Sequence, residues 1–396
     1  MDIYVDNAAT TKMSRGSIDA MVHCMESVYG NPSSLHTTGQ VAAEAMAAAR
    51  EAMAGHLGCT PREIYFTSGG SEADNQAILS AAAQGEKKGK KHIVSTAYEH
   101  HAVLHVLEKL ERQGFEVTLL DVHEDGLVTA EEVDAAIRDD TCLVTIMFAN
   151  NEIGTILPIA EIGAVCKSRG VLFHTDAVQA AGHLPINVAD LHIDMLSLSA
   201  HKFHGPKGVG LLYARRGVPL VNVIEGGAQE RGKRGGTENV PGIVGMAAAL
   251  DEADAHLEER ALKVSALRDR LIAGLEQIPH SILNGDRTHR LPNNVNFCFE
   301  GIEGESLLLL LDQKGIRVSS GSACTSGSLE PSHVLLAIGR PHEVAHGSLR
   351  ISLCHENTEA EIDYIIDSVK EVVTYLRGFS PMWQDLQEEK RSYVIQ

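Results

Sequence analysis

Two segments of this 396-residue chain place a reactive side chain among small and turn-forming residues. Lys202 lies in the segment SAHKFHGPKG (199–208), which follows a strand-like run. A desolvated lysine in such a place becomes a nucleophile that forms Schiff bases, and a solvated surface lysine is the alternative. Cys324 lies in SSGSACTSGS (319–328), whose residues are too small to pack a core. We therefore expect a mobile loop that carries a thiol to a fixed cofactor.

The segment TSGGSE (67–72) has the composition of an anion-binding turn between a strand and a helix. Glycine lets the backbone approach a phosphate, and the first turn of a helix presents free N–H groups. The segment matches neither the P-loop nor the dinucleotide-binding pattern. The alternative is an ordinary helix start with Ser71 as N-cap and Asp74 at the third helical position.

Two polar side chains follow the strand-like run 171–175. Asp176 closes the run and Gln179 lies one turn later, at the place where ligands bind in open α/β sheets. The alternative is that Asp176 caps a helix at 177–181.

His100 and Arg350 are basic residues of the kinds that bind planar rings and carboxylates. His100 is either an acid–base group or the stacking partner of a planar ring, and a surface pair with His101 is the alternative. Arg350 lies in the strand-like run 348–353. If it points inward, its fork matches a carboxylate, and an exposed position on an edge strand is the alternative.

The sequence predicts no metal site. His201 and His204 are close together, but no third ligand stands at a usual spacing. The seven cysteines are scattered without a CxxC pair, which argues against a disulfide framework and a cysteine-based zinc site. Cys142 and Cys298 lie in apolar runs, so we expect them to be buried.

The composition is that of a folded, acidic protein. The chain has 34 Lys and Arg against 53 Asp and Glu, a net charge of −19, which argues against a general binder of nucleic acid or anionic membranes. No apolar run approaches the ~20 residues of a membrane span. The first residues show no basic or apolar leader, so we expect a cytoplasmic protein with reduced thiols.

Strand-like and helical runs alternate between about residues 40 and 215. The expected helices cover 41–57 and about 71–83, and the expected strands cover 64–66, 92–95, 117–120, 143–148, 171–174, 195–199 and 210–213. This alternation predicts an α/β fold with a mostly parallel sheet and helices on both faces.

The later part of the chain has a different pattern. A long helix at about 241–277 precedes strands near 294–299, 317–319 and 348–353 and a last helix at about 359–377. This pattern predicts a smaller α+β domain. The tail from Ser380, with the lone Trp383, is either a frayed terminus or a segment that docks a partner.

Taken in order, these segments resemble one family over nearly the whole chain. It is the NifS-type cysteine desulfurases, pyridoxal-phosphate enzymes of class V within the fold-type-I aminotransferase superfamily. The motifs that carry the resemblance are VDNAATT (5–11), GNPSSLH (30–36), NNEIG (150–154), HTDAVQ (174–179), HKFHGPKG (201–208) and SSGSACTSGSLEPSH (319–333). Ser71 stands where threonine is common in that family, and its hydroxyl is retained.

The resemblance implies a fold-type-I architecture with two domains. The large domain, with a mostly parallel central sheet, would bind pyridoxal 5′-phosphate and cover 16–255. The small α+β domain would join 1–15 to 256–396 and carry the cysteine loop at about 319–333.

The resemblance also implies roles for single residues. Lys202 would hold the cofactor as a Schiff base, Asp176 would pair with its ring nitrogen, Gln179 would bind the ring hydroxyl and His100 would stack on the ring. The phosphate would be held by Gly70, Ser71, Ser199 and His201, with Thr237 reaching it from the neighbouring subunit of a homodimer. Asn151, also near the cofactor, and Arg350 would bind the substrate carboxylate, and Cys324 would accept sulfur.

The implied reaction converts L-cysteine to L-alanine and leaves a persulfide on Cys324. The sulfur would pass to an iron–sulfur scaffold protein of the NifU or IscU kind. A selenocysteine lyase, or another fold-type-I lyase or aminotransferase, is the alternative. An aminotransferase has no need of a mobile thiol, so the loop around Cys324 favours the desulfurase.

Overall fold

A seven-stranded sheet forms the centre of the computed structural model, which describes residues 2–320 and 331–395. Its strands are β2 (Ile64–Thr67), β3 (His92–Thr96), β4 (Glu116–Leu120), β5 (Thr141–Thr145), β6 (Leu172–Asp176), β7 (Met195–Ser199) and β8 (Gly210–Ala214). They lie in the order β2-β8-β7-β6-β5-β3-β4. Only β8 runs antiparallel to its neighbours, so the predicted mostly parallel sheet is confirmed.

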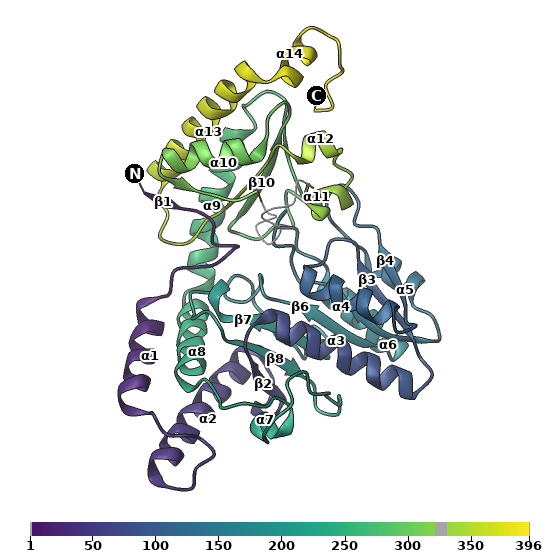
Figure 1. The fold of residues 1–396 in the computed structure, drawn as a ribbon, viewed down its shortest axis with the longest axis vertical. Helices are drawn as coiled ribbons and strands as arrows, with labels where there is room; N and C mark the ends of the chain where they lie inside the picture. Colours follow the sequence, from purple (N-terminus) through teal and green to yellow (C-terminus); the bar gives the residue numbers. More distant parts are fainter. Residues whose placement is uncertain (1, 321–330, 396) are drawn as a thin grey trace.

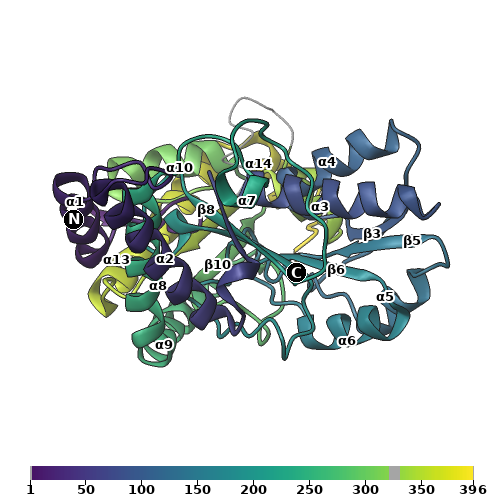
Figure 2. The same cartoon turned by 90° about the horizontal axis from the view of Figure 1, so that it is seen from below.

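Helices cover both faces of this sheet, as Figure 2 shows. One face carries α3 (Gly70–Lys87) and α4 (His101–Glu111), and the other carries α5 (Ala130–Ala136) and α6 (Ile159–Arg169). Every residue of β3, β5, β7 and β8 is buried. Strands covered on both faces need near-continuous apolar sequence, which is why these runs could be recognised.

Three long helices pack together at one end of the sheet (Figure 1). They are α1 (Arg15–Ser27), α2 (Thr37–Leu57) and α8 (Val240–Ala255). Three short helices also belong to this part of the chain: η1 (Pro61–Glu63) follows α2, η2 (Ala200–Lys202) follows β7 and α7 (Gln229–Gly232) precedes α8. Gly58 ends α2 in the left-handed conformation, with φ of 68°. This is the stop that the glycine predicts.

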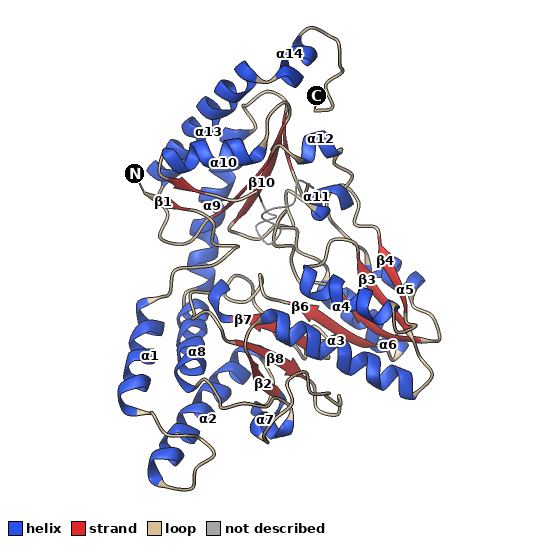
Figure 3. Ribbon diagram, viewed as in Figure 1, coloured by secondary structure: helices blue, strands red, loops and turns tan. Residues whose placement is uncertain are grey.

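A second core forms from the two ends of the chain. Strands β9 (Ser281–Leu283), β10 (Asn294–Phe299) and β12 (Ser348–Ser352) form an antiparallel sheet, and β1 (Ile3–Tyr4) pairs with β11 (Ile316–Arg317). The helices of this part are α9 (Leu257–Leu275), α10 (Gly304–Gln313), α11 (His333–Ala337), α12 (His342–Ala345) and α13 (Glu359–Phe379). Ile3 and Val5 are buried among residues of 264–373. Figure 3 shows β1 close to the helices and strands of this part. The domain boundaries after residues 15 and 255 remain a prediction.

Two expectations about the later chain are wrong. The helix expected at 241–277 is two helices, because His256 leaves helical geometry with φ of −120° and ψ of 15°. The tail is not frayed: α14 (Pro381–Gln387) places the Trp383 ring 3.9 Å from the guanidinium carbon of Arg377. The amides of Val394 and Ile395 donate to the Glu300 carboxylate, so the tail docks on its own chain.

Among the helices within residues 2–320 and 331–395, none is both long enough and apolar enough to cross a bilayer.

The contact between α2 and α8 predicts a pH-dependent stability. His56 lies between Asp251 and Asp254, at 2.5 and 2.6 Å, and these hydrogen bonds raise its pKa from 6.5 to about 9. A raised folded-state pKa stabilises the fold fully below pH 6.5, and this contribution is lost as the pH rises through 9. We expect His56→Gln to lower the free energy of unfolding by about 1 kcal/mol more near pH 6 than near pH 10.

Urea denaturation at both pH values measures this difference. The matched control is His23→Gln, because His23 is exposed. An equal loss of stability for His56→Gln at both pH values would contradict the assignment.

Candidate active site

A cavity of about 320 Å³ lies at the carboxyl ends of the parallel strands. It is lined by ten of the twelve residues predicted for the site, which are Gly70, Ser71, His100, Asn151, Asp176, Gln179, Ser199, His201, Lys202 and Arg350. Thr237 is exposed and does not line the cavity. Cys324 lies outside the described residues. The fold thus brings together side chains that are up to 280 positions apart in the chain, from Gly70 to Arg350.

Lys202 is held by the backbone of the N-terminal segment. It follows β7 in η2, and its Nζ donates to the carbonyl oxygens of Ala8 at 2.5 Å and Ala9 at 2.8 Å. Gln179 donates to the same Ala8 carbonyl at 3.0 Å. The alternative of a solvated surface lysine is therefore wrong, and the amine points into the cavity.

The turn before α3 is shaped for close approach by a ligand. Gly69 is the N-cap, so the interpretation of Ser71 as N-cap is wrong. A Cβ on Gly70 would lie 2.7 Å from Cγ2 of Val178. Only glycine fits there, and the first-turn amides of Gly70 and Ser71 have no partners within the helix. Ser199, buried at the end of β7, lines the same wall.

His201 forms the neighbouring wall of the cavity. Its Nδ1 lies 3.1 Å from Oγ1 of Thr10, which fixes the ring. Burial and the charge of Lys202 lower the pKa of His201 to about 4, so its imidazole is neutral.

Asp176 is buried at the end of β6, with its Oδ1 accepting from the Val178 amide at 2.9 Å. Residues 178–181 form turns and no helix follows Asp176 directly, so the alternative that Asp176 caps a helix at 177–181 is wrong. Burial raises the pKa of Asp176 to about 6, although the amide of Val178 and the charge of Lys202 oppose the shift. Above that pH the carboxylate is a buried anion suited to a cationic N–H donor.

His100 caps α4 with its side chain. Its Nδ1 accepts from the Ala102 amide at 3.1 Å, so the ring proton lies on Nε2. Burial, followed by the charges of Lys202 and the neighbouring histidines, lowers the pKa of His100 to about 4. The ring is a neutral N–H donor on the cavity wall, and the alternative of a surface pair is wrong.

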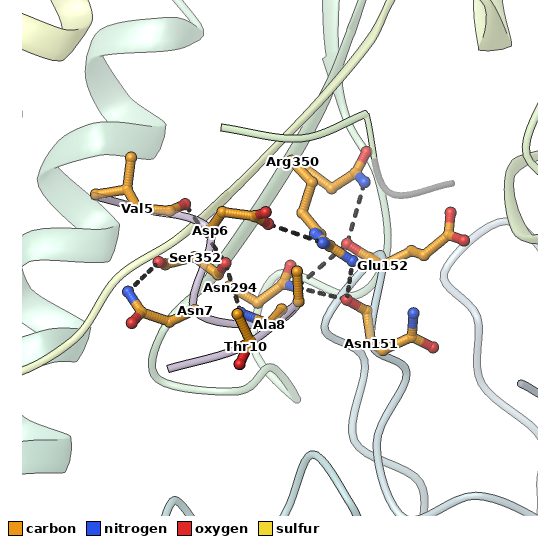
Figure 4. Close-up of polar contacts among 12 residues, drawn as sticks. Val5, Asp6, Asn7, Ala8, Thr10, Asn151, Glu152, Asn294, Arg350 and Ser352 are labelled. Atoms are coloured by element: carbon orange, nitrogen blue, oxygen red, sulfur yellow. Dashed lines mark hydrogen bonds and ion pairs between the residues drawn. The ribbon is translucent and has the colours of Figure 1, made fainter. Parts of the chain in front are cut away.

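Arg350 is buried between the two cores (Figure 4). Its Nη2 lies 3.0 Å from Oδ1 of Asp6, and its Nη1 donates to the Asn151 carbonyl at 3.2 Å. Its Nε has no hydrogen-bond partner among the described residues. The alternative of an exposed edge-strand residue is therefore wrong, and the guanidinium keeps donor capacity for a carboxylate.

Sequence reasoning assigned no role here to several residues. Ala8 and Ala9 act through carbonyl oxygens, which give no sequence signal. Asp6 was part of a quoted motif, but nothing marked it as the partner of Arg350. Asp74 also lines the cavity, and it was interpreted only as a helix-start residue.

The tautomer of His100 is directly testable. We expect its imidazole to stay neutral, with the proton on Nε2, from about pH 5 to pH 8, because burial keeps its pKa near 4. Nitrogen NMR of the histidine rings, with His100→Gln to assign the signal, measures this. A ring that titrates near pH 6.5 would contradict the buried geometry.

Comparison with known proteins identifies the family. The model of the class-V aminotransferases matches residues 3–365. The chain belongs to this family. Within it, the chain is 55% identical to a cysteine desulfurase IscS of Methanosarcina thermophila over 96% of this chain and 94% of that protein. It is therefore a NifS-type cysteine desulfurase by family.

Solved structures agree with this assignment. A NifS-like protein superposes with a TM-score of 0.89 at 41% identity, over 95% of this chain and all of that one. SspA in complex with cysteine superposes with a TM-score of 0.80 at 38% identity, over 90% of this chain and all of that one.

Enzymes of this family depend on pyridoxal phosphate, and the cavity fits that group. The amine of Lys202 points into it, and the cradle at Gly70 has no room for a Cβ. The buried Asp176 carboxylate accepts from one backbone amide, which leaves oxygen lone pairs for a ring N–H.

Proposed function

We propose that this protein is a cysteine desulfurase that converts L-cysteine to L-alanine, transfers the sulfur to Cys324 as a persulfide and supplies iron–sulfur cluster assembly. One observation carries the proposal: Lys202 after β7, Asp176 at the end of β6 and Arg350 in the middle of β12 converge on one cavity. An amine, a buried anion and a carboxylate-binding fork suit an amino acid substrate. The cysteine bound to the related SspA supports this choice of substrate.

The cavity residues have distinct roles toward the cofactor. Lys202 would hold it covalently, Asp176 would bind its ring nitrogen, Gln179 its ring hydroxyl and His100 its ring face. Gly70, Ser71, Ser199 and His201 would bind its phosphate. When bound, pyridoxal phosphate supplies an electron sink for the carbon that loses a proton.

The chain's own groups then move the protons and the sulfur. Arg350 and Asn151 orient the substrate carboxylate, and the released Nζ of Lys202 takes the proton from Cα. His100 exchanges a proton at the substrate sulfur through Nε2. The Cys324 thiolate attacks that sulfur, so an S–S bond forms, the C–S bond breaks and its electron pair stays on carbon. Protonation of that carbon gives alanine.

The proposal includes a homodimer in the cytoplasm. Thr237 would reach the cofactor phosphate of the neighbouring subunit, and its exposed position outside its own cavity supports this.

The two-domain division at 16–255, and 1–15 with 256–396, would let the cysteine loop approach the cavity. A NifU- or IscU-like scaffold would accept the sulfur. The net charge of −19 suits a protein that does not bind nucleic acid in bulk.

Two variants separate cofactor binding from sulfur transfer. We expect Cys324→Ala to keep the cofactor's absorbance but to lose sulfide production from cysteine by at least about a hundredfold, because the nucleophile is gone. Lys202→Ala should lose both, because it removes the covalent link and the base.

Absorbance spectra and sulfide release measure these effects. The matched control is Cys59→Ala, whose thiol lies half-buried away from the cavity. Undiminished turnover in Cys324→Ala would exclude the proposed nucleophile.

A further inference from the structure

Buried polar side chains of β5, β6 and β7 form a chain next to α3. This helix covers one face of the sheet in Figure 2. His174 of β6 lies at the centre of the chain of side chains, with Nδ1 2.8 Å from Oγ1 of Thr145 and Nε2 3.0 Å from Oγ of Ser197. The carboxyl of Asp74 in α3 completes the group, with its Oδ1 3.6 Å from Nε2 of His174. All four side chains are at most 1% exposed.

This chain lies directly beside Asp176. His174 stands two residues before Asp176 on β6, so both side chains point to the same face. Ser197 is the register partner of Asp176 on β7. Asp74 and Asp176 both line the cavity.

The Thr145 and Ser197 hydroxyls hydrogen-bond to the two ring nitrogens of His174. Burial lowers the pKa of His174 to about 3, which keeps the ring neutral. His174 therefore brings no cation to Asp74.

Asp74 has one carboxyl oxygen to which no described residue hydrogen-bonds. Its Oδ1 is buried without a hydrogen-bond partner among the described residues, and Nε2 of His174 is 3.6 Å away, too far for a hydrogen bond. A buried carboxylate oxygen without a partner is costly, whereas a protonated oxygen there carries no charge.

The charges around the pair favour one ionised carboxylate. Burial and the nearby Asp176 and Glu99 raise the pKa of Asp74 well above its ordinary value. Lys202 is a cation that lowers the pKa of Asp176, and it is not among the groups that shift the pKa of Asp74. A buried carboxyl group beside an anion ionises less readily, so the negative charge of the pair falls on Asp176.

We propose that Asp74 is a positioning residue that stays a neutral carboxylic acid and so keeps the single negative charge of the pair on Asp176. The inference rests on the proposed function in one respect, because that function has Asp176 bind the cofactor's ring nitrogen. Neither the charge state of Asp74 nor the Ser197–His174–Thr145 chain follows from that function.

Infrared spectroscopy tests the charge state without any turnover. We expect the protein at pH 8, with and without pyridoxal phosphate, to show the C=O stretch of a protonated carboxyl that shifts on 13C-labelling of aspartate. Asp74→Asn should remove this band, and Glu99→Gln is the matched control that should keep it, because Glu99 is the other buried acid nearby. Absence of an aspartate-derived band in the unsubstituted protein would overturn the proposal, whether or not the variants fold.

The bound cofactor gives a second readout. If Asp74 is already neutral, Asp74→Asn should change the dissociation constant of pyridoxal phosphate by less than about threefold and leave the pH titration of its absorbance in place. Asp176→Asn should weaken binding by more than about tenfold. A tenfold change or a displaced titration in Asp74→Asn would show a charged Asp74 and overturn the proposal. If the unsubstituted protein shows the infrared band but does not turn over cysteine, that result counts against the proposed function alone.

Discussion

The position of the N-terminal segment 5–11 between the two cores is the constraint on which the site depends. On one side, Ala8 and Asn7 hydrogen-bond to Ser352 of β12, and the Asp6 carboxylate pairs with Arg350. On the other side, the carbonyls of Ala8 and Ala9 accept from Lys202, and Thr11 hydrogen-bonds to the backbone of His201. One segment thus positions the amine from the large sheet and the guanidinium from the small sheet around one cavity. Figure 4 shows its contacts with Arg350 and Ser352.

Burial then decides which groups of the cavity carry charge. The walls contain two cationic side chains, Lys202 and Arg350, and the two histidines are kept neutral by burial. Arg350 is already paired with Asp6, so a substrate carboxylate has to share or replace that partner. The neutral His100 can lie against a planar ring and donate from Nε2, whereas a charged ring would repel the Lys202 ammonium. The electrostatics therefore suit an anionic cofactor and a zwitterionic substrate.

The sequence predicted what depends on side-chain type and spacing. The strands could be recognised from apolar runs, and ten site residues from motifs that the fold brings to one cavity. For Lys202, His100 and Arg350 the alternative of an exposed surface position was wrong. The exposure of a side chain depends on segments that are distant in the sequence, and the local sequence does not show which segments these are.

Backbone contacts, a helix break and the burial of one carboxyl group could not be predicted from the sequence. The carbonyls of Ala8 and Ala9 could belong to any residue type. The break at His256 involves neither glycine nor proline, so nothing in the sequence marks it. Asp74 is a common helix-start residue, and only packing of α3 on β6 and β7 shows that its carboxyl is buried beside Asp176.

The central claim is that Cys324 is the thiol that accepts sulfur. Other cysteines of the chain serve as internal controls for this claim. Burial raises the pKa of Cys59 to about 12, raises that of Cys354 and keeps both thiols protonated and unreactive. Mass spectrometry of peptides from the cofactor-loaded protein after incubation with L-cysteine tests the claim most directly. The account predicts one added sulfur on the peptide that contains Cys324. Sulfur added to Cys59 or Cys354 instead, or to no cysteine while alanine is formed, would contradict it.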